Sequence, residues 1–324
     1  MPQTNFCKRE NSMIEEVTII TAFFDIGRGN WQGKMQRSNE KYFEYFDFWA
    51  RIKNKIVVYT EPQYKQKVLD IRRKYGLLDR TEVIAIENET ELDGEVYKAI
   101  NHALKNPLAQ SFRVEQDHPE VYNPDYNYVT YLKFYFMSQA VKSGFCQNMC
   151  AWMDFGYNKG GHFYTNADDF DYLWTLDLSP DKIHIFTFGA EEELWELPIF
   201  EVVRTLEVYI SGEIVIAPKS IAEDFCALCR RAELSLGDVG LSDDDQTILL
   251  MAYRTRPELF ELHQMLGWCD QMRLVADKKF VTRKGANIPH KEAKRLAKKA
   301  WKEKDIKDAA KHYADYVSLK LKGK

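Results

Sequence analysis

The feature that most constrains the fold is an unbroken run of apolar and β-branched residues near the start, Val17–Phe24 (VTIITAFF). A run without polar alternation is typical of a strand covered on both faces of a sheet. Similar runs follow at Lys55–Tyr59 (KIVVY), Val83–Ile86 and Met149–Asp154, with helix-patterned segments between them. Strands that alternate with helices predict an α/β fold built on a mostly parallel sheet.

Further elements follow from the same patterns. Helices are predicted at Tyr42–Ile52, Tyr64–Tyr75, Leu92–Leu104, Val129–Ser143, Lys219–Leu234, Asp243–Arg254, Glu258–Leu266 and His290–Leu319, strands at Ile183–Phe188 and Ile214–Ala217, and a loop at Ser111–Asn127, which contains Pro119 and Pro124. Open α/β sheets bind ligands outside the carboxyl ends of their strands. The loops after Phe24, Tyr59 and Asp154 are therefore expected to carry the site.

Composition limits the class of protein. The 324 residues are 45% hydrophobic and 14% aromatic, which suits a large core and excludes a globally disordered chain. We expect a disordered segment at residues 1–13, one domain at 14–275 and a basic helical tail at 276–324. No window approaches the ~18 apolar residues of a membrane span, and the polar first dozen residues do not resemble a signal peptide.

The number and spacing of the cysteines indicate the cellular compartment and whether a metal site is expected. Six cysteines are too few for a disulfide scaffold, which favours a reducing cytoplasm. Cys226-Ala-Leu-Cys229 has redox or zinc spacing, but it lies in a helix-patterned segment without a second pair at ligand spacing. We interpret these as ordinary thiols.

Charge is unevenly distributed. The net charge is −4, yet Lys278–Lys324 holds 16 Lys and Arg against 5 Asp and Glu. Its predicted helix combines seven cations with a few apolar residues: Lys291, Lys294, Arg295, Lys298, Lys299, Lys302 and Lys304 with Leu296, Ala297, Ala300 and Trp301. This pattern fits a helix on an anionic membrane surface or one docked on the acidic body. It lacks a recognised nucleic-acid motif, so no nucleic-acid partner is predicted.

The first loop, Asp25–Lys34 (DIGRGNWQGK), nearly matches two phosphate-binding motifs. It departs from Walker A because Arg28 stands where that motif needs glycine, and from the kinase loop because Gln32 stands at the third glycine. Glycines still let the backbone approach a ligand, and cations lie beside them: Arg28, Lys34 and Arg37. A diphosphate site and a flexible surface loop both remain open.

Asp154 ends the apolar run in Ala151–Phe163 (AWMDFGYNKGGHF). Asp-Phe-Gly would suit a kinase, but the His-Arg-Asp and Val-Ala-Ile-Lys segments are absent. A helix that carries Lys133, followed by a strand that ends in an aspartate, suits nucleotide-sugar binding, with Asp154 on a divalent ion that bridges two phosphates. Gly156 replaces the second acid of an Asp-x-Asp motif. The alternative is that Asp154 caps the next turn.

Three successive acids open the segment Leu241–His263. Ser242 or Asp243 would be a good N-cap, and acids favour the first helical turn. Asp244 or Asp245 could instead act as a general base that deprotonates an acceptor hydroxyl. His263 could bind a metal, although a lone histidine on a helix is more often structural.

Several of these segments together resemble the HtrL/YibB family of bacterial proteins. They are Ile20–Trp31 (ITAFFDIGRGNW), Ile56–Glu61 (IVVYTE), Tyr131–Val141 (YLKFYFMSQAV), Trp152–Tyr157 (WMDFGY) and Asp243–Leu249 (DDDQTIL). The resemblance covers roughly residues 17–270. That family is associated with lipopolysaccharide and O-antigen gene clusters and is regarded as having a GT-A glycosyltransferase fold.

The resemblance implies an inverting glycosyltransferase, assisted by Mn²⁺ or Mg²⁺, that moves a hexose from a UDP-sugar to a hydroxyl of an undecaprenyl-diphosphate-linked glycan. Its implied site residues are Thr21, Ala22 and Arg28 at the nucleotide, Lys133 and Asp154 at the diphosphate and metal, and Asp244 or Asp245 at the acceptor, with Arg37 adding charge. Such an enzyme would be cytoplasmic, at the inner face of the membrane. A non-catalytic nucleotide- or polysaccharide-binding protein and a phosphotransferase are the alternatives.

Overall fold

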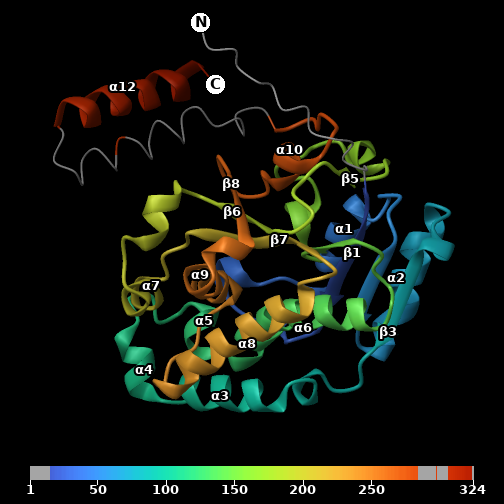
Figure 1. Ribbon diagram of the computed structural model, residues 1–324, viewed down its shortest axis with the longest axis horizontal. Helices are drawn as coiled ribbons and strands as arrows, with labels where there is room; N and C mark the ends of the chain where they lie inside the picture. Colours follow the sequence, from blue (N-terminus) through green and yellow to red (C-terminus); the bar gives the residue numbers. More distant parts are fainter. Residues whose placement is uncertain (1–14, 284–296, 298–305, 323–324) are drawn as a thin grey trace, which may run out of the picture.

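The computed structural model describes residues 15–283, residue 297 and residues 306–322 (Figure 1). The expectation of disorder at residues 1–13 lies outside these residues, as do the seven cations named above in the predicted tail helix. The described part of the tail is helix α12 (Ile306–Lys322).

A mixed sheet organises the chain. Its strands are β1 (Glu15–Phe23), β2 (Ile56–Thr60), β3 (Thr81–Ala85), β4 (Met149–Met153), β5 (Thr175–Leu176), β6 (Ile183–Thr187), β7 (Ile210–Pro218) and β8 (Phe260–Gln264). The order is β3-β2-β1-β4-β7-β6-β8, and the short β5 pairs with β1. Strand β7 is antiparallel to both its neighbours, whereas β3, β2, β1 and β4 are mutually parallel. This reversal brings the beginning of β7 to the carboxyl ends of β1 and β4.

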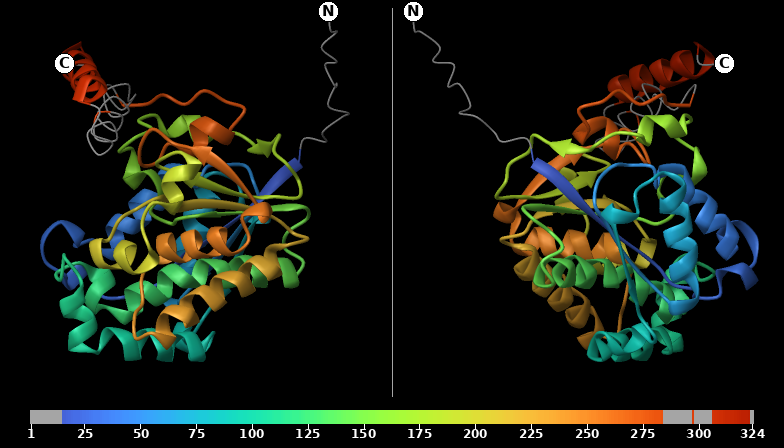
Figure 2. Two further views of the ribbon diagram at one scale, coloured as in Figure 1. Left: turned by 60° about the vertical axis from the view of Figure 1, so that its left-hand side comes forward. Right: turned by 90° about the vertical axis from the view of Figure 1, so that its right-hand side faces the viewer.

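Helices cover both faces of the sheet (Figures 1 and 2). They are α1 (Asn39–Trp49), α2 (Pro62–Lys74), α3 (Gly94–Leu104), α4 (Pro107–Phe112), α5 (Pro119–Tyr122), α6 (Pro124–Lys142), α7 (Ile199–Thr205), α8 (Ala222–Asp238), α9 (Asp245–Thr255) and α10 (Gln271–Val275). One apolar cluster joins the sheet to α3, α6, α8 and α9, and another joins it to α1, α2 and α10. The expected class, an α/β fold with a mostly parallel sheet between helices, is confirmed.

Strand β1 shows why the run from Val17 onward contains only apolar and β-branched residues. Ile19 and Phe23 lie in the cluster with α1, whereas Ile20 lies in the cluster with α6. Successive side chains of a strand point to opposite faces, so a strand with a core on each side needs apolar residues at every position.

Two predicted elements are wrong. Glu258–Leu266 was expected to be a helix, but it contains β8, which pairs in parallel with β6. Tertiary pairing decides such a short apolar segment more than its own periodicity does. The expected loop Ser111–Asn127 contains α5 and the start of α6, because Pro119 and Pro124 occupy first helical positions, where proline is favoured.

Among the described residues, no helix is both long and apolar enough to span a bilayer. The helix α8 includes Cys226 and Cys229, and both are free thiols.

Candidate functional site

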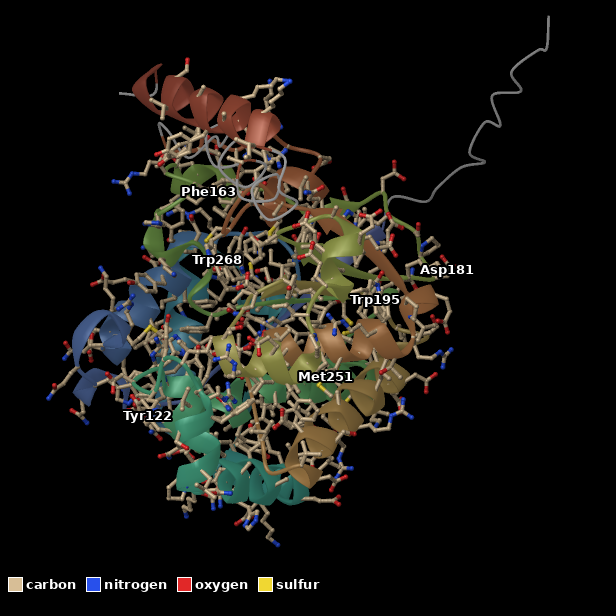
Figure 3. The ribbon with its side chains drawn as sticks, turned by 90° about the vertical axis from the view of Figure 1, so that its left-hand side faces the viewer. Tyr122, Phe163, Asp181, Trp195, Met251 and Trp268 are labelled. Carbon is tan, nitrogen blue, oxygen red and sulfur yellow. The ribbon has the colours of Figure 1, made fainter. Side chains whose placement is uncertain are left out.

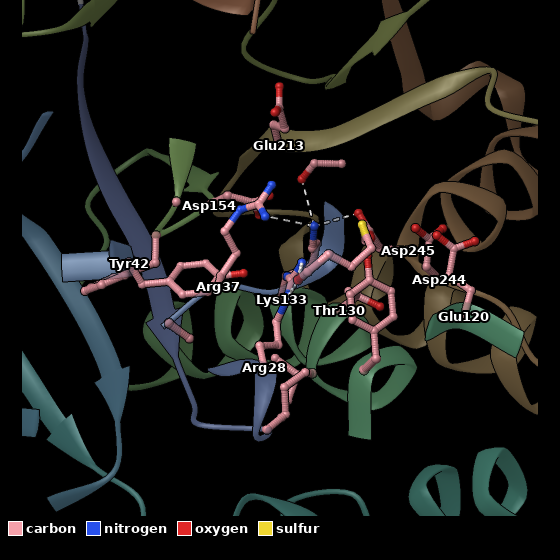
Figure 4. A pocket seen from close by; sticks show the side chains of 18 of the residues that line it. Arg28, Arg37, Tyr42, Glu120, Thr130, Lys133, Asp154, Glu213, Asp244 and Asp245 are labelled. Carbon is pink, nitrogen blue, oxygen red and sulfur yellow. Dashed lines mark hydrogen bonds and ion pairs between the residues drawn. The ribbon is translucent and has the colours of Figure 1, made fainter. Parts of the chain in front are cut away.

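A cleft of about 490 Å³ opens at the carboxyl ends of β1 and β4. The loop after β1, the helix α6, the end of β4, the start of β7 and the start of α9 all contribute to its lining (Figure 4). It thus lies where two of the three loops singled out from the sequence meet. Of the residues predicted for the site, seven line it: Ala22, Arg28, Arg37, Lys133, Asp154, Asp244 and Asp245.

Lys133 is the centre of the polar network in this cleft. Its Nζ donates to Asp245 Oδ2 at 2.6 Å, to the Gly212 carbonyl at 2.7 Å and to Asp154 Oδ1 at 3.4 Å. The Lys133 side chain is 4% exposed, and burial alone would lower its pKa, but the carboxylates of Asp154 and Asp245 outweigh that effect and raise it. The lysine is therefore charged and holds two acids from distant parts of the chain close together.

Gly212 makes this arrangement sterically feasible. A Cβ atom at this position would lie 1.5 Å from Asp245 Oδ2 and 3.0 Å from Lys133 Nζ. No side chain fits there, because the Asp245 carboxylate packs directly against the backbone of β7. The glycine thus belongs to the site although it contributes no functional group.

The three acids that open α9 have separate partners. Asp243 pairs with Arg113 at 3.1 Å and accepts from Thr247 Oγ1 at 2.8 Å, so it has a structural role. Asp244 is the N-cap of α9 and accepts from the Gln246 N–H at 2.9 Å, whereas Ser242 or Asp243 had been expected there. Asp245 faces Lys133.

Asp244 also faces Glu120 of α5, whose carboxyl hydrogen-bonds to it. Burial, followed by the charge of Asp243, raises the pKa of Glu120 to about 8. Burial and the nearby Glu120 raise the pKa of Asp244 well above its ordinary value. Two close buried carboxyl groups share one proton and titrate as a pair. Such a pair can accept or release a proton near neutral pH.

Two arginines supply positive charge on the opposite side of the cleft from α9 (Figure 4). The loop before Arg28 turns at Gly27, whose φ of 73° is in the left-handed region that favours glycine, and Asp25 Oδ1 accepts from the Gly27 N–H at 2.9 Å. The Arg28 guanidinium donates to the Met35 carbonyl at 3.2 Å and lies 5.1 to 5.7 Å from three aromatic rings, those of Trp31, Tyr42 and Tyr126. These contacts hold the cation in place before any ligand binds.

Thr21 does not reach the cleft. Its side chain is fully buried, on the face of β1 that turns away from α6, and its hydroxyl has no hydrogen-bond partner among the described residues. Ala22, the next residue, does line the cleft. Side chains alternate along a strand, so Thr21 and Ala22 point to opposite faces of β1.

The lining residues that were missed from the sequence include Glu120, Glu213 and Trp268. Glu120 lay in a segment taken for a loop. Burial and then the nearby Asp154 raise the pKa of Glu213, which accepts from the Cys269 N–H at 2.9 Å. Trp268 is 43% exposed and packs on Phe188 with ring centroids 4.6 Å apart (Figure 3). Nothing local in the sequence distinguishes these residues from other acidic or aromatic residues of the chain.

Asp154 could hold a divalent ion only jointly with a ligand. Its side chain is 37% exposed, and the hydrogen bonds from Trp152 Nε1 (2.6 Å) and Lys133 both reach Oδ1. Within the described residues, Oδ2 is therefore the oxygen left for an ion. Mg²⁺ is commonly held by one or two carboxylates together with substrate phosphates, which fits a single aspartate beside a diphosphate.

The comparisons with known proteins agree with the resemblance noted in the sequence. Residues 15–277 match the family described as "Bacterial protein of unknown function (HtrL_YibB)". The chain belongs to the HtrL/YibB family. Protein HtrL of Escherichia coli (strain K12) is 28% identical over an alignment of 285 residues that covers 81% of this chain and 93% of that protein.

Among solved structures, the chain is similar to the apo form of mouse xyloside xylosyltransferase 1. The TM-score is 0.40 and the sequence identity is 13%, over 76% of this chain and 84% of the mouse chain.

Proposed function

We propose that this HtrL/YibB protein is a glycosyltransferase of the GT-A type that transfers a hexose from a UDP-sugar to a hydroxyl of a glycan carried on a lipid diphosphate. The observation that carries the proposal is the meeting of Asp154, Lys133 and Asp245 in one cleft, at the carboxyl ends of parallel strands, with Arg28 in the same cleft. A cleft that combines fixed cations with one accessible carboxylate suits a diphosphate and its counter-ion.

The donor diphosphate binds between Arg28, Arg37 and Asp154 in this proposal. The two arginines offset charge that develops on the leaving UDP. Asp154 would hold Mn²⁺ or Mg²⁺, and the ion would supply Lewis-acid chemistry at the leaving group. We assign Lys133 a positioning role, in place of the direct diphosphate contact expected from the sequence, because it is buried between two carboxylates. It positions Asp154 and Asp245 and does not face the phosphates directly.

The proton of the acceptor hydroxyl goes to the pair formed by Asp244 and Glu120. Asp245 is the weaker candidate for the base, because its carboxylate is engaged by the Lys133 ammonium at 2.6 Å. The hydroxyl oxygen forms the new bond to the anomeric carbon as the bond from that carbon to UDP breaks. Attack from the face opposite to UDP would invert the anomeric configuration.

Trp268 offers a surface against which a sugar of the acceptor glycan would pack. It is partly exposed at the cleft, and an aromatic ring can pack against the apolar face of a hexose.

In the basic tail, the exposed Ile306, Tyr313 and Val317 are spaced seven and four residues apart, which places them on one side of α12. Contact of this side with anionic lipid would bring the cleft to a membrane-bound acceptor.

The decisive test compares Asp154→Asn with Asp224→Asn, an exposed aspartate of α8 outside the cleft. We expect the first to abolish UDP release from UDP-hexoses in the presence of Mn²⁺ and a polyprenyl-diphosphate glycan, with an unchanged far-UV spectrum. The second should match the wild type. Full activity in Asp154→Asn would remove the proposed mechanism.

Thermal stability with nucleotides separates the alternatives. Stabilisation by UDP with Mn²⁺ requires a nucleotide site. Stabilisation without any UDP release on adding acceptors would favour a non-catalytic binding protein. Stabilisation by ATP but not by UDP would favour a phosphotransferase.

A further inference from the structure

Two histidines and a glutamate meet on β6 and β8, at the edge of the sheet farthest from β3. His184 is the register partner of Glu261, and Phe186 is the partner of His263. Residues 184, 186, 261 and 263 therefore share one face of this strand pair. None of the three ligand-type residues lines the cleft described above.

Their ligand atoms converge. His184 Nδ1 lies 3.1 Å from His263 Nε2 and 3.9 Å from Glu261 Oε2, and all three atoms lie within 4.8 Å of one another. A tetrahedral zinc ion with bonds of about 2.0–2.1 Å holds its ligand atoms roughly 3.3 Å apart. The two nitrogens are already at that spacing, and a small rotation of the Glu261 side chain would complete it.

Outer contacts orient these ligands. His184 Nε2 lies 2.9 Å from the Ser179 carbonyl, which can only accept, so this nitrogen carries the ring proton and the lone pair of Nδ1 faces the cluster. The Ser179 hydroxyl donates to Glu261 Oε2. Metal-binding histidines generally donate their second ring N–H to a carbonyl or carboxylate, and metal-binding carboxylates are themselves hydrogen-bonded.

Burial and access are consistent with an ion. The His184 side chain is fully buried, while that of Glu261 is 39% exposed, which leaves a path from solvent.

We propose that His184, Glu261 and His263 bind a zinc ion that ties the edge strand β8 to β6. His184 binds through Nδ1 and His263 through Nε2, with the proton of the His263 ring on Nδ1. Glu261 supplies one oxygen, and water completes the coordination. This site is separate from the divalent ion of the proposed transfer reaction, and it does not depend on that reaction. It would stabilise the strand that precedes Trp268.

The test uses the full-length protein, freed of metal with a chelator and dialysed, with Co²⁺ as a spectroscopic probe and Zn²⁺ in calorimetry. We expect wild type to bind one equivalent of Zn²⁺ and to show the visible absorption of Co²⁺ with nitrogen ligands. Glu261→Gln keeps an acceptor for the Ser179 hydroxyl and should fold normally, and it should weaken Zn²⁺ binding at least tenfold. His263→Asn should do the same.

Two controls locate the ion. Asp154→Asn, in the cleft, and His102→Asn, an exposed histidine of α3, should both keep the cobalt spectrum and the Zn²⁺ affinity. Unchanged Zn²⁺ affinity in both Glu261→Gln and His263→Asn would overturn the proposal, as would a wild type that binds no Zn²⁺ at micromolar concentration. In those cases the two histidines are partners in a hydrogen bond alone.

Discussion

Replacing Gly212 by alanine tests whether the polar network of the cleft is as tightly packed as the structure shows. The added methyl would lie 1.5 Å from Asp245 Oδ2 and 2.6 Å from its Cγ, so the carboxylate must move. Moving it breaks the 2.6 Å contact with Lys133 and leaves a buried ammonium with Asp154 at 3.4 Å as its remaining charged partner. One methyl group would thus disrupt a buried ion pair.

The size of the effect follows from burial. The Lys133 and Asp245 side chains are 4% and 5% exposed, so water does little to screen their interaction. Breaking a buried pair while one charge stays behind costs about 3–5 kcal/mol. For a domain of this size, each kcal/mol lowers the melting temperature by roughly 2–4 °C, which gives a total of roughly 6–20 °C.

Differential scanning calorimetry at pH 7 measures this, with Gly94→Ala as the matched control. Gly94 starts α3, has ordinary backbone angles, and a Cβ there meets nothing within 4 Å. The control should melt within a few degrees of wild type. In the double variant Gly212→Ala/Asp245→Ala, the clash is gone, so the second substitution should cost much less than it does alone. A Gly212→Ala protein that melts like the Gly94→Ala control would refute the reasoning.

Three further predictions concern pH, charge and sugar contact. Burial raises the pKa of Glu233 from 4.5 to about 8, so the stability contributed by the protonated carboxyl group is complete below pH 4.5 and is lost as pH rises through 8. Glu233→Gln should flatten that part of the plot of melting temperature against pH. A variant whose plot matches that of the wild type would contradict this. Arg28→Met should weaken UDP binding, measured by calorimetry, by roughly 10–150-fold, which is the loss expected for one charge-assisted hydrogen bond. The control Arg231→Met, at an exposed arginine of α8, should leave UDP binding unchanged. Trp268→Ala should raise the acceptor KM more than it lowers kcat, and Trp268→Phe should restore much of the loss; equal KM values for wild type and the alanine variant would exclude the proposed sugar contact.

Much of the fold could be predicted because its patterns are local. The runs in β1, β2 and β4 consist of apolar and β-branched residues without polar alternation, and that pattern alone indicates strands with a core on both faces. The acid at the end of β4 and the arginine after β1 could be placed near each other without coordinates, because parallel strands deliver their carboxyl ends to one edge. Arg28, Lys133 and Asp154 do line one cleft.

The contacts that only the tertiary structure determines depend on pairing between distant segments. Lys133 and Asp245 are 112 residues apart, and they meet only because β7 runs against its neighbours and presents Gly212 between them. The segment of β8 resembles a helix in its own periodicity and becomes a strand by pairing with β6, which also brings His263 to His184. Thr21 and Ala22 were both predicted to contact the nucleotide, but their side chains point to opposite faces of β1, and of the two only Ala22 lines the cleft. Local periodicity specifies which faces are apolar, but the partners of buried charges are set by register and strand direction, which no short stretch of sequence encodes.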